Sequence, residues 1–546
     1  MNSTSCRSTE LHTQHHSGNP WKYIQYLLLA AIVLGILMRL YRFFIFHHLW
    51  GDEAYIAINI IERNFVGLTE PLDNRQVAPP GFLILIKCVF ESIHQLWSMR
   101  ILPLAAGLIS IPLFGWCILH LFNRRVALWS TALFSVTLST IFYSTEIKPY
   151  TIDALCSVLL LLPALLYINA PTQNRWLYIP LICVAPMVWI SFTSSIVICS
   201  IGVILVLFTC WHRVSTIRTH QPLSLYQYNH KAILLSATAM LFIISGILLY
   251  FLVIKPNEQS ISNEKLMEDW TFLDAFPPID RPWLLPWWFI SVHTGKMLSY
   301  PWGGKHFGSI LSFALCLSGI WTLVTKRNWW LLGLLVSPFI MGILFAALHI
   351  YPYGRHIRIM LYLAPFVTLL MGIGIEGFFA WYKLKKPQHA DLMILALAIA
   401  FFVTPIGMAI KETMQSYNEF THGNIGQLLG NVNHKTTDND LIACYNTLDP
   451  HTGSGPEIQF ELYMMRKIDH QIHDSGLLPL DKQQPGSKIF AISFHYNLDP
   501  EAHQIQEWLD RIGQNAKWIN RQRAKSTTHT SEFISVDEFV VQAISD

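Results

Sequence analysis

The chain has 546 residues, of which 52% are hydrophobic and only 13% are charged. Soluble proteins carry roughly 25% charged residues, so this composition excludes an ordinary soluble protein and predicts one built for lipid. The net charge of +3 gives no indication of a nucleic-acid partner. Most of the cysteines fall in or beside apolar runs, which is typical of small packing residues rather than of a disulfide framework.

Residues 1–20 are polar, and we expect them to form a cytoplasmic N-terminal tail. The apolar run that follows spans residues 23–46 and contains Arg39 and Arg42 near its end. A cleaved signal peptide has a shorter apolar region and a small-residue cleavage site. We therefore interpret this run as a retained helix that opens a transmembrane domain over residues 21–410.

Apolar runs long enough to cross about 30 Å of hydrocarbon recur throughout this domain. The stretch 176–211 is too long for one helix, and its polar centre at Ser191–Ser195 predicts two spans joined by a tight turn. The sequence thus predicts a polytopic α-helical membrane protein with about eleven transmembrane helices. They fall near residues 23–46, 101–122, 126–143, 151–169, 176–211 (two spans), 232–253, 306–325, 328–349, 359–382 and 391–410.

Segment 80–97 is ambiguous because its apolar run is interrupted by ionisable residues, among them Lys87. If it does not cross, basic clusters such as Arg124-Arg125 and Lys326-Arg327 fall in cytoplasmic loops, as the positive-inside rule requires. We therefore predict an amphipathic helix in the outer interface, with Lys87 reaching up to the interface. The alternative is that Lys87 meets a lipid phosphate. The parts of the chain that then face the outside of a cell (inner) membrane are 47–100, 144–150, 254–305, 350–358 and residues from 411 onward.

Residues 411–546 are polar and mixed in charge, unlike the rest of the chain. Short apolar stretches at 441–445, 489–494 and 533–541 predict strands, whereas 457–467 and 502–518 predict helices. The alternation predicts a small extracytoplasmic α/β domain, soluble in character.

The first candidate site is Asp52-Glu53, two adjacent carboxylates where the first transmembrane helix leaves the bilayer. Carboxylates close to hydrocarbon are costly unless they are paired or used. Neighbouring acids and partial burial can raise a pKa towards the range of a general base. Adjacent helical residues point about 100° apart, so we expect only one of the two to face a substrate. The alternative is a solvated helix end or an ion pair with Arg39 or Arg42.

The second candidate site is the turn from Tyr143 to Asp153, which places several ionisable groups between two spans. In the functional interpretation, Lys148 faces a phosphate and is held by Glu146, while Asp153 stands at the mouth of the next helix. Tyr150 follows Pro149, which ends the preceding helix. The alternative is a turn in which Glu146 and Lys148 neutralise each other.

The third candidate site runs from Tyr351 to Arg358, with Tyr353 and His356 as supporting residues. Arg355 and Arg358 lie on the outer side, against the positive-inside trend. Guanidinium groups suit phosphate recognition through bidentate hydrogen bonds. Contact with anionic lipid headgroups is the alternative. We predict no metal site, because no cluster of ligands stands out from the sequence, and we leave metal dependence open.

These motifs and their order resemble the GT-C membrane glycosyltransferases, of the protein mannosyltransferase and aminoarabinose transferase kind and especially their bacterial branch. The resemblance covers residues 50–153 and 351–365 and is absent from the C-terminal region. It is carried by Asp52-Glu53, Pro79–Phe82, Met99–Pro103, Leu121–Ala127 and Glu146–Tyr150.

The resemblance implies transfer of a sugar from a polyprenyl-phosphate carrier to an acceptor at the outer (periplasmic) membrane face, with inversion. Asp52 would be the catalytic base and Glu53 its neighbour in the motif. Lys148, Arg355 and Arg358 would meet the carrier phosphate. This chain departs from the family where Ala78 replaces a common His and Lys148 replaces the commoner Arg.

The partners implied are membrane lipid, a lipid-linked sugar donor and an unknown acceptor that is a lipid, a glycan or a protein. No cofactor beyond the donor substrate is implied. A transporter or flippase of lipid-linked saccharides is the main competing hypothesis, but transporters place ionisable residues near the bilayer midplane and show repeated halves. Here the charges gather at one interface. A membrane-anchored binding protein that works through its C-terminal domain is the other alternative.

Overall fold

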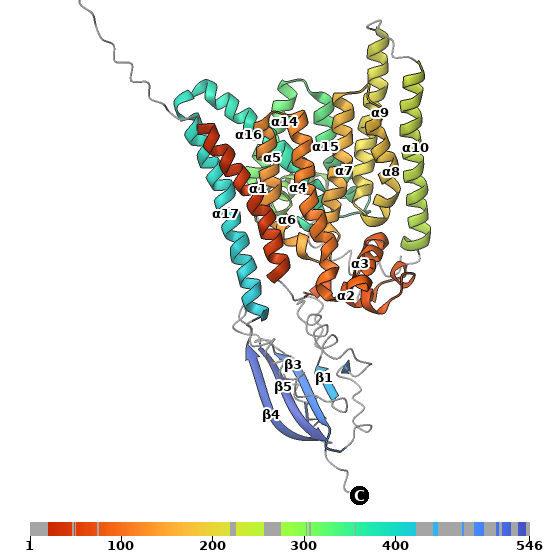
Figure 1. The fold of residues 1–546 in the computed structure, drawn as a ribbon, viewed down its shortest axis with the longest axis vertical. Coiled ribbons are helices and arrows are strands. Elements are labelled where there is room, and N and C mark those ends of the chain that lie inside the picture. Colours follow the sequence, from red (N-terminus) through yellow and green to blue (C-terminus); the bar gives the residue numbers. More distant parts are fainter. Residues whose placement is uncertain are drawn as a thin grey trace, which may run out of the picture.

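The computed structural model contains a long helical bundle and a separate C-terminal sheet (Figure 1). The residues that it describes are 20–45, 49, 51–73, 76–218, 225–255, 275–301, 303–304, 307–354, 356–421, 441–445, 472–473, 485–495, 509–510, 512, 516–525 and 533–541.

The bundle consists of apolar helices that run between its two ends (Figure 1). All eleven predicted segments are helical in the structure. They form α1 (Pro20–Ile45), α4 (Ile101–Leu121), α5 (Arg124–Val136) with α6 (Leu138–Phe142), α7 (Tyr150–Asn169), α8 (Arg175–Ile190), α9 (Ser194–Arg218), α10 (Leu225–Leu249), α14 (Ile310–Thr325), α15 (Trp329–Ala347), α16 (Ala364–Lys385) and α17 (Pro387–Thr421).

Not all of these helices have the length of a full membrane span. Within the described residues, seven are long and apolar enough to cross a membrane, and the pair Arg124–Val136 and Leu138–Thr145, bent by 59°, makes up to eight. Three further apolar helices are shorter. The chain is therefore a multi-pass helical membrane protein, while the predicted number of about eleven crossings stays a prediction.

The bend between α5 and α6 has a local cause at Thr137. Its backbone is extended, with φ −60° and ψ 121°. Its hydroxyl donates to the Leu133 carbonyl at 2.6 Å, which occupies an acceptor at the end of α5. Side-chain hydrogen bonds of this kind compete with the helical backbone bonds and bend helices. The chain thus turns into the short 3-10 helix η4 (Tyr143–Thr145) and then into the second candidate site.

Two short helices, α2 (Gly51–Glu62) and α3 (Pro80–Ile93), lie across one end of the bundle, which we call the site end (Figure 1). Pro80 at the first position of α3 suits a helix start. The prediction that Lys87 reaches up to the interface is wrong. Lys87 is buried, donates to the Ile60 carbonyl at 2.8 Å and pairs with Glu91 at 2.9 Å. Its ammonium group therefore ties α3 to the end of α2.

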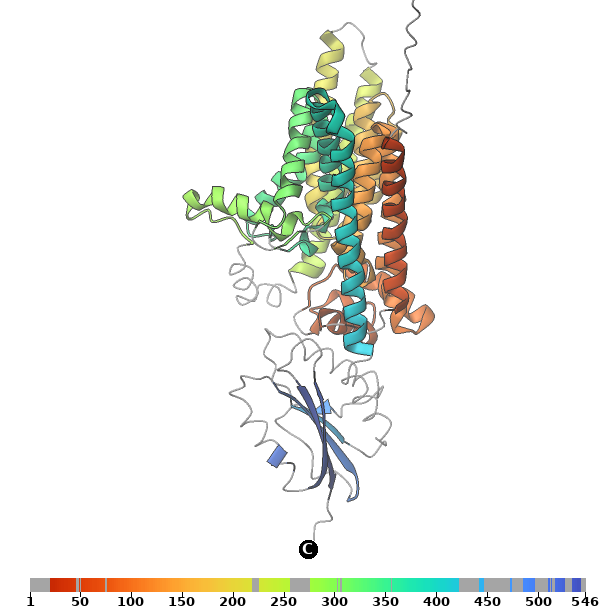
Figure 2. The ribbon, with the colours of Figure 1, turned by 90° about the vertical axis from the view of Figure 1, so that its left-hand side faces the viewer.

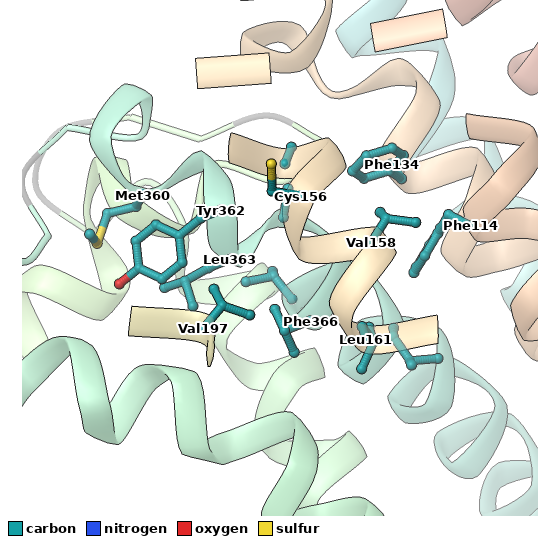
Figure 3. Packing of buried hydrophobic residues seen from close by; sticks show 14 of the residues in the cluster. Phe114, Phe134, Cys156, Val158, Leu161, Val197, Met360, Tyr362, Leu363 and Phe366 are labelled. Carbon is teal, nitrogen blue, oxygen red and sulfur yellow. The ribbon is translucent and has the colours of Figure 1, made fainter. Parts of the chain in front are cut away.

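Helix α16 forms the centre of the bundle and is almost entirely buried up to Ile375. Small residues let its neighbours approach closely, as in other membrane bundles. A Cβ at Gly372 would clash with the Ser130 hydroxyl, and one at Gly374 would clash with the Leu315 carbonyl. Figure 3 shows the start of this helix, with Phe366 among side chains from other elements. This packing fixes the helix ends that carry the candidate site.

The segment before α14 forms a short arm. It contains η6 (Pro282–Leu284), α13 (Leu285–Thr294) and η7 (Lys296–Leu298). The arm projects sideways from the bundle (Figure 2). Trp283 and Trp287 are exposed on it, whereas Trp288 and His293 are buried. Exposed tryptophans of this kind are typical of a membrane–water interface.

Within its described residues, the C-terminal region forms one five-stranded sheet in the order β2-β1-β3-β5-β4. It lies beyond the site end of the bundle (Figures 1 and 2). The inner strand β1 pairs in parallel with β2 and β3, while β5 pairs antiparallel with β3 and β4. The strands are β1 (Leu441–Tyr445), β2 (Ile472–His473), β3 (Lys488–His495), β4 (Ala516–Lys525) and β5 (Phe533–Val541).

The three predicted strands are confirmed in β1, β3 and β5. The predicted helix over 502–518 is wrong at its last three residues, because β4 begins at Ala516 and pairs there with Val541. The predicted helix over 457–467 lies outside the described residues. Helix α17 continues past residue 410 to Thr421. The proposed boundaries at 20, 410 and 411 stay predictions.

Candidate active site

Glu53 lies in the first turn of α2, and its carboxylate is fully buried against Arg100. Arg100 ends the 3-10 helix η3 (Leu96–Arg100), directly before α4. Its Nη2 donates to Oε2 at 3.0 Å and its Nε to Oε1 at 3.3 Å, and each side chain is 2% exposed. The two parallel bonds form a bidentate, charge-assisted pair. The pair holds α2 against the start of α4.

Glu53 also binds the second candidate site. The backbone N–H of Ile147 donates to its Oε1 at 2.7 Å. One carboxylate thus joins α2, η3 and the turn after α6, which are separated by 47 and 94 residues along the chain. Removing one partner from a buried ion pair leaves an uncompensated charge, so this junction has a strong energetic reason to stay intact.

Glu146 lies next to this junction and is itself buried. Burial raises the pKa of its carboxyl well above the usual value, and the negative charge of Glu53 raises it further. Arg42, Arg100 and Lys148 act in the opposite direction. Its Oε1 has no hydrogen-bond partner within the described residues. Glu146 therefore holds its proton to higher pH than an ordinary glutamate.

The cations of the second candidate site have fixed positions. The Nε of Arg42 donates to the Thr145 hydroxyl at 3.3 Å, and its guanidinium lies 4.5 Å from the centre of the Phe142 ring. The Nζ of Lys148 donates to Oε1 of Gln76 at 3.1 Å. Lys148 is buried, so its charge sits in a region of low effective dielectric. Gln76 belongs to the segment that leads into the Pro79-Pro80 start of α3.

Asp153 is buried in the first turn of α7, as the sequence places it. The Ser191 hydroxyl donates to its Oδ1 at 2.6 Å. Ser191 stands in the predicted tight turn, which is confirmed between Ile190 at the end of α8 and Ser194 at the start of α9. An acid in the first turn of a helix is stabilised by the helix dipole. Tyr150, the first residue of α7, packs edge-on against Tyr143 at 5.0 Å between ring centres.

Tyr353 anchors the third candidate site to α13. The Nδ1 of His293 lies 2.7 Å from the Phe289 carbonyl, which can only accept, so this nitrogen carries the hydrogen. Its Nε2 therefore accepts from the Tyr353 hydroxyl at 2.9 Å. Burial lowers the pKa of His293 to about 4, which agrees with a neutral ring. The Tyr353 backbone N–H also donates to the Ala275 carbonyl at 2.9 Å.

The third candidate site lies close to Asp153. Burial raises the pKa of Tyr351 well above its usual value, and the charge of Asp153 raises it further, while Arg358 lowers it. Arg358 begins the 3-10 helix η8 (Arg358–Leu363), which packs against α7. His356 is partly exposed, and its backbone N–H donates to the Gly354 carbonyl at 2.6 Å. Gly354 has φ 85°, a conformation that favours glycine.

The structure thus brings Glu53, Glu146 and Lys148 together at the site end, and it places Tyr150, Asp153 and Arg358 around Tyr351. Tyr353 and His356 belong to the same segment as Tyr351. Arg355 lies outside the described residues, and so does the side chain of Asp52, whose backbone belongs to α2. No group of three metal-ligating side chains occurs in the described part of the chain. The expectation of no metal site stays a prediction.

Sequence reasoning missed three residues of this site: Arg100, Gln76 and His293. The cation that pairs with Glu53 is Arg100, rather than Arg39 or Arg42 as the alternative interpretation expected. Arg39 instead donates to the carbonyls of Gly35 and Ser135, both at 2.7 Å. A signal for Arg100 was present, because an arginine at the outer end of a span contradicts the positive-inside trend.

Among solved structures, the chain is similar to ArnT from Cupriavidus metallidurans bound to undecaprenyl phosphate. The identity is 11%, 94% of this chain and 98% of that chain are covered, and the TM-score is 0.49. It is also similar to the archaeal oligosaccharyltransferase AglB from Archaeoglobus fulgidus in complex with an inhibitory peptide and a dolichol-phosphate. There the identity is 11%, the coverage is 91% and 73%, and the TM-score is 0.48.

No protein-family model matches the chain, and no curated protein matches it. Both structural likenesses combine low identity with a TM-score below 0.5. The function proposed below therefore rests on the residues of this chain and on the geometry of its site end.

Proposed function

We propose that this chain is an integral membrane glycosyltransferase that moves a sugar from a polyprenyl-phosphate carrier to an acceptor. The observation that carries the proposal is the buried junction of Glu53, Arg100 and the Ile147 N–H. It brings the acidic motif of α2 together with the Glu146–Asp153 turn. Acids and cations from distant parts of the chain thus meet at one end of an apolar bundle, where both a lipid phosphate and a polar acceptor could reach them.

The reaction is a single displacement. Asp52 takes the proton of an acceptor hydroxyl or amine, whose oxygen or nitrogen forms the new bond to the anomeric carbon. The bond between that carbon and the carrier phosphate oxygen breaks, and its electron pair leaves with the phosphate. Attack from the face opposite the leaving group inverts the anomeric carbon. Neither a cofactor nor an oxidant enters the balance.

The cations stabilise the leaving phosphate in this proposal. Lys148 is buried beside Gln76, and Arg358 begins η8. Charge that develops on a phosphate is stabilised strongly by preorganised donors in a site of low dielectric. Arg355 is assigned the same role from its motif. Lys148 supplies a point charge rather than the planar fork of an arginine.

Glu53 acts as a positioning residue in this proposal, because both of its oxygens already accept hydrogen bonds from Arg100 and Ile147. Its junction fixes α2 and hence the neighbouring Asp52. The raised pKa of Glu146 favours its protonated form, which avoids a second negative charge beside Glu53. Asp52 is then the carboxylate of the pair that is assigned to proton transfer.

The proposed orientation places the site end outside the cytoplasm, in the inner membrane of the cell. The charge distribution supports it. Arg124 and Arg125 follow the far end of α4, and Lys326 and Arg327 follow the far end of α14. These basic turns lie at the end of the bundle opposite α2 and α3, as expected for cytoplasmic loops.

The test uses membranes from cells that express wild type, Asp52→Asn or Asp73→Asn, incubated with radiolabelled polyprenyl-phosphate sugars and a panel of acceptors. Asp73 is an exposed acid near the site that pairs with Arg63 at 2.9 Å, so its variant is a matched control. We expect transfer by wild type and by Asp73→Asn and its loss in Asp52→Asn. Unchanged transfer by Asp52→Asn removes Asp52 as the base, and no transfer by wild type to any acceptor contradicts the proposal.

A further inference from the structure

A second feature of the bundle lies far from the candidate active site. A cavity of about 1050 Å³ opens at the far ends of α4, α7 and α14, where Leu121, Asn169 and Lys326 line it. The candidate active site lies at the opposite ends of α4 and α7, next to Arg100 and Tyr150. A helix of about 20 residues is about 30 Å long, so the two sites stand on opposite sides of the bundle.

The walls of this cavity are mostly apolar and aromatic. Trp321 and Trp381 line it and are exposed at its edge, while Phe208 lies buried inside. Its size is at the upper end of small-molecule pockets, which measure roughly 300–1,000 Å³. Exposed tryptophans at helix ends are typical of the boundary between headgroups and hydrocarbon. The cavity is therefore suited to a molecule with both an apolar and a polar part.

The polar groups of the cavity carry both signs of charge. Lys326 stands exposed at the mouth, and Glu376 lines the wall with a side chain that is 17% exposed. Glu376 is paired with Arg125 at 3.5 Å. Its Oε2 has no hydrogen-bond donor among the described residues.

Two helix starts add to the positive side of the cavity. Helix α5 begins beside Asn123 and α15 begins beside Asn328, and both asparagines line the cavity. The side-chain oxygens of these asparagines already accept from the N–H groups of Val126 and Leu331. The helix dipole and the remaining N–H groups of the first turn still attract an anion. Together with Lys326, these helix starts suit a phosphate. Glu376, on the other hand, suits a cation with N–H donors.

We propose that this cavity binds a phospholipid with a primary amine in its headgroup, of the phosphatidylethanolamine type. The phosphate of this lipid lies towards Lys326 and the start of α15, and its ammonium group lies towards Glu376. The parts of the acyl chains next to the headgroup lie along the two tryptophans. The lipid comes from the leaflet opposite the candidate active site. This binding needs no sugar transfer and does not depend on the proposed function.

The test measures lipid binding to the purified full-length protein by native mass spectrometry. The probes are phosphatidylethanolamine, phosphatidylcholine and phosphatidylglycerol with the same acyl chains. Phosphatidylcholine keeps both charges but lacks N–H donors, and phosphatidylglycerol lacks the amine. We expect phosphatidylethanolamine to bind about tenfold more tightly than either, a difference typical of one hydrogen bond to a charged group. Equal binding of all three, or tighter binding of phosphatidylglycerol, overturns the proposal.

Variants locate the binding. Lys326→Gln should weaken phosphatidylethanolamine binding about tenfold, whereas Lys386→Gln removes the same charge from an exposed lysine outside the cavity and should have little effect. Glu376→Gln should abolish the preference over phosphatidylcholine. Ala380→Trp fills the cavity one turn beyond Glu376 and should reduce the binding of all three lipids. Unchanged binding in both Lys326→Gln and Ala380→Trp would place the lipid elsewhere.

A last measurement distinguishes binding of the phospholipid from binding of the sugar donor's lipid carrier. A polyprenyl phosphate is added to the protein already loaded with phosphatidylethanolamine. We expect no displacement, because the carrier phosphate belongs at the other end of the bundle. If the carrier displaces phosphatidylethanolamine from wild type but not from Ala380→Trp, the cavity holds the distal end of the polyprenyl chain. That result would overturn the proposal.

Discussion

Glu53 and Arg100 form a buried ion pair with two hydrogen bonds, of 3.0 and 3.3 Å, between the first turn of α2 and the start of α4. Their side chains are each 2% exposed. A pair of this kind contributes little net stability compared with apolar residues, but it becomes costly when one partner is lost. The pair therefore acts on the position of α2 and on the Glu146 turn more than on overall stability.

The first prediction concerns this asymmetry. Arg100→Gln should lower the free energy of unfolding by about 3–5 kcal/mol, because it leaves the Glu53 charge buried without its cation. The double variant Glu53→Gln with Arg100→Gln should recover part of this loss. Thermal unfolding of the detergent-purified protein measures both. Arg63→Gln, which breaks an exposed pair with Asp73, is the control and should change stability by about 1 kcal/mol or less.

The second prediction concerns the pH dependence of Glu146. Its carboxyl lies near Glu53, Arg42, Arg100 and Lys148, and burial raises its pKa above the ordinary value of 4.5. At pH values between 4.5 and the raised pKa, the folded protein binds a proton at Glu146 that the unfolded chain has already released. The contribution of Glu146 to stability is therefore fully present below pH 4.5 and is lost as pH rises through its folded pKa.

Glu146→Gln removes this titration, so the stability difference between wild type and variant should shrink with rising pH and then become constant. Unfolding followed from pH 4.5 upward measures it. A difference that stays flat across the whole range would contradict a raised pKa of Glu146.

The third prediction concerns Lys148, the lysine that is assigned to stabilise the carrier phosphate. Loss of one preorganised donor to a developing oxyanion lowers kcat by about 10²–10³ in other enzymes. Lys148→Ala should lower sugar transfer by a factor of that order, whereas Lys148→Arg keeps the charge and should retain most of it. Lys255→Ala removes an exposed lysine that follows α10 at the same end of the bundle and serves as the control. Equal transfer by Lys148→Ala and wild type would remove Lys148 from the site.

The sequence predicts the helical segments because each is a long apolar run, and the structure forms all of them. The sequence also predicts which loops lie together at one end of the bundle, because the basic clusters mark the loops at the opposite end. It does not predict that Arg100 rather than Arg39 or Arg42 meets Glu53. All three arginines are near helix ends in the sequence, and only the rotation of α2 and the packing of α4 decide which guanidinium comes within reach.

The same limit explains Lys87 and β4. A lysine at the end of an apolar run is typical of the membrane interface. The Nζ of Lys87 instead lies 2.8 Å from the Ile60 carbonyl, because α2 folds over α3. Ala516-Lys517-Trp518 fits a helix end as well as a strand, and pairing with β5 decides in favour of the strand. Contacts between distant segments supply the information that local pattern lacks.

The fourth prediction concerns His293, which connects α13 to the third candidate site through the Tyr353 hydroxyl. Burial among the rings of Phe289, Phe313 and Tyr353 lowers its pKa from 6.5 to about 4. Between these values the unfolded chain binds a proton that the folded protein does not. Stability should therefore fall as pH is lowered from about 6.5 to about 4.

The loss of stability across this pH range should be smaller in His293→Phe, which cannot titrate, than in wild type. Tyr353→Phe keeps the imidazole but removes its hydrogen-bond donor, so it should lower stability by about 1 kcal/mol at pH 7. Both values come from thermal unfolding in buffers from pH 4 to pH 7.5. Parallel pH profiles for wild type and His293→Phe would mean that His293 does not titrate in this range.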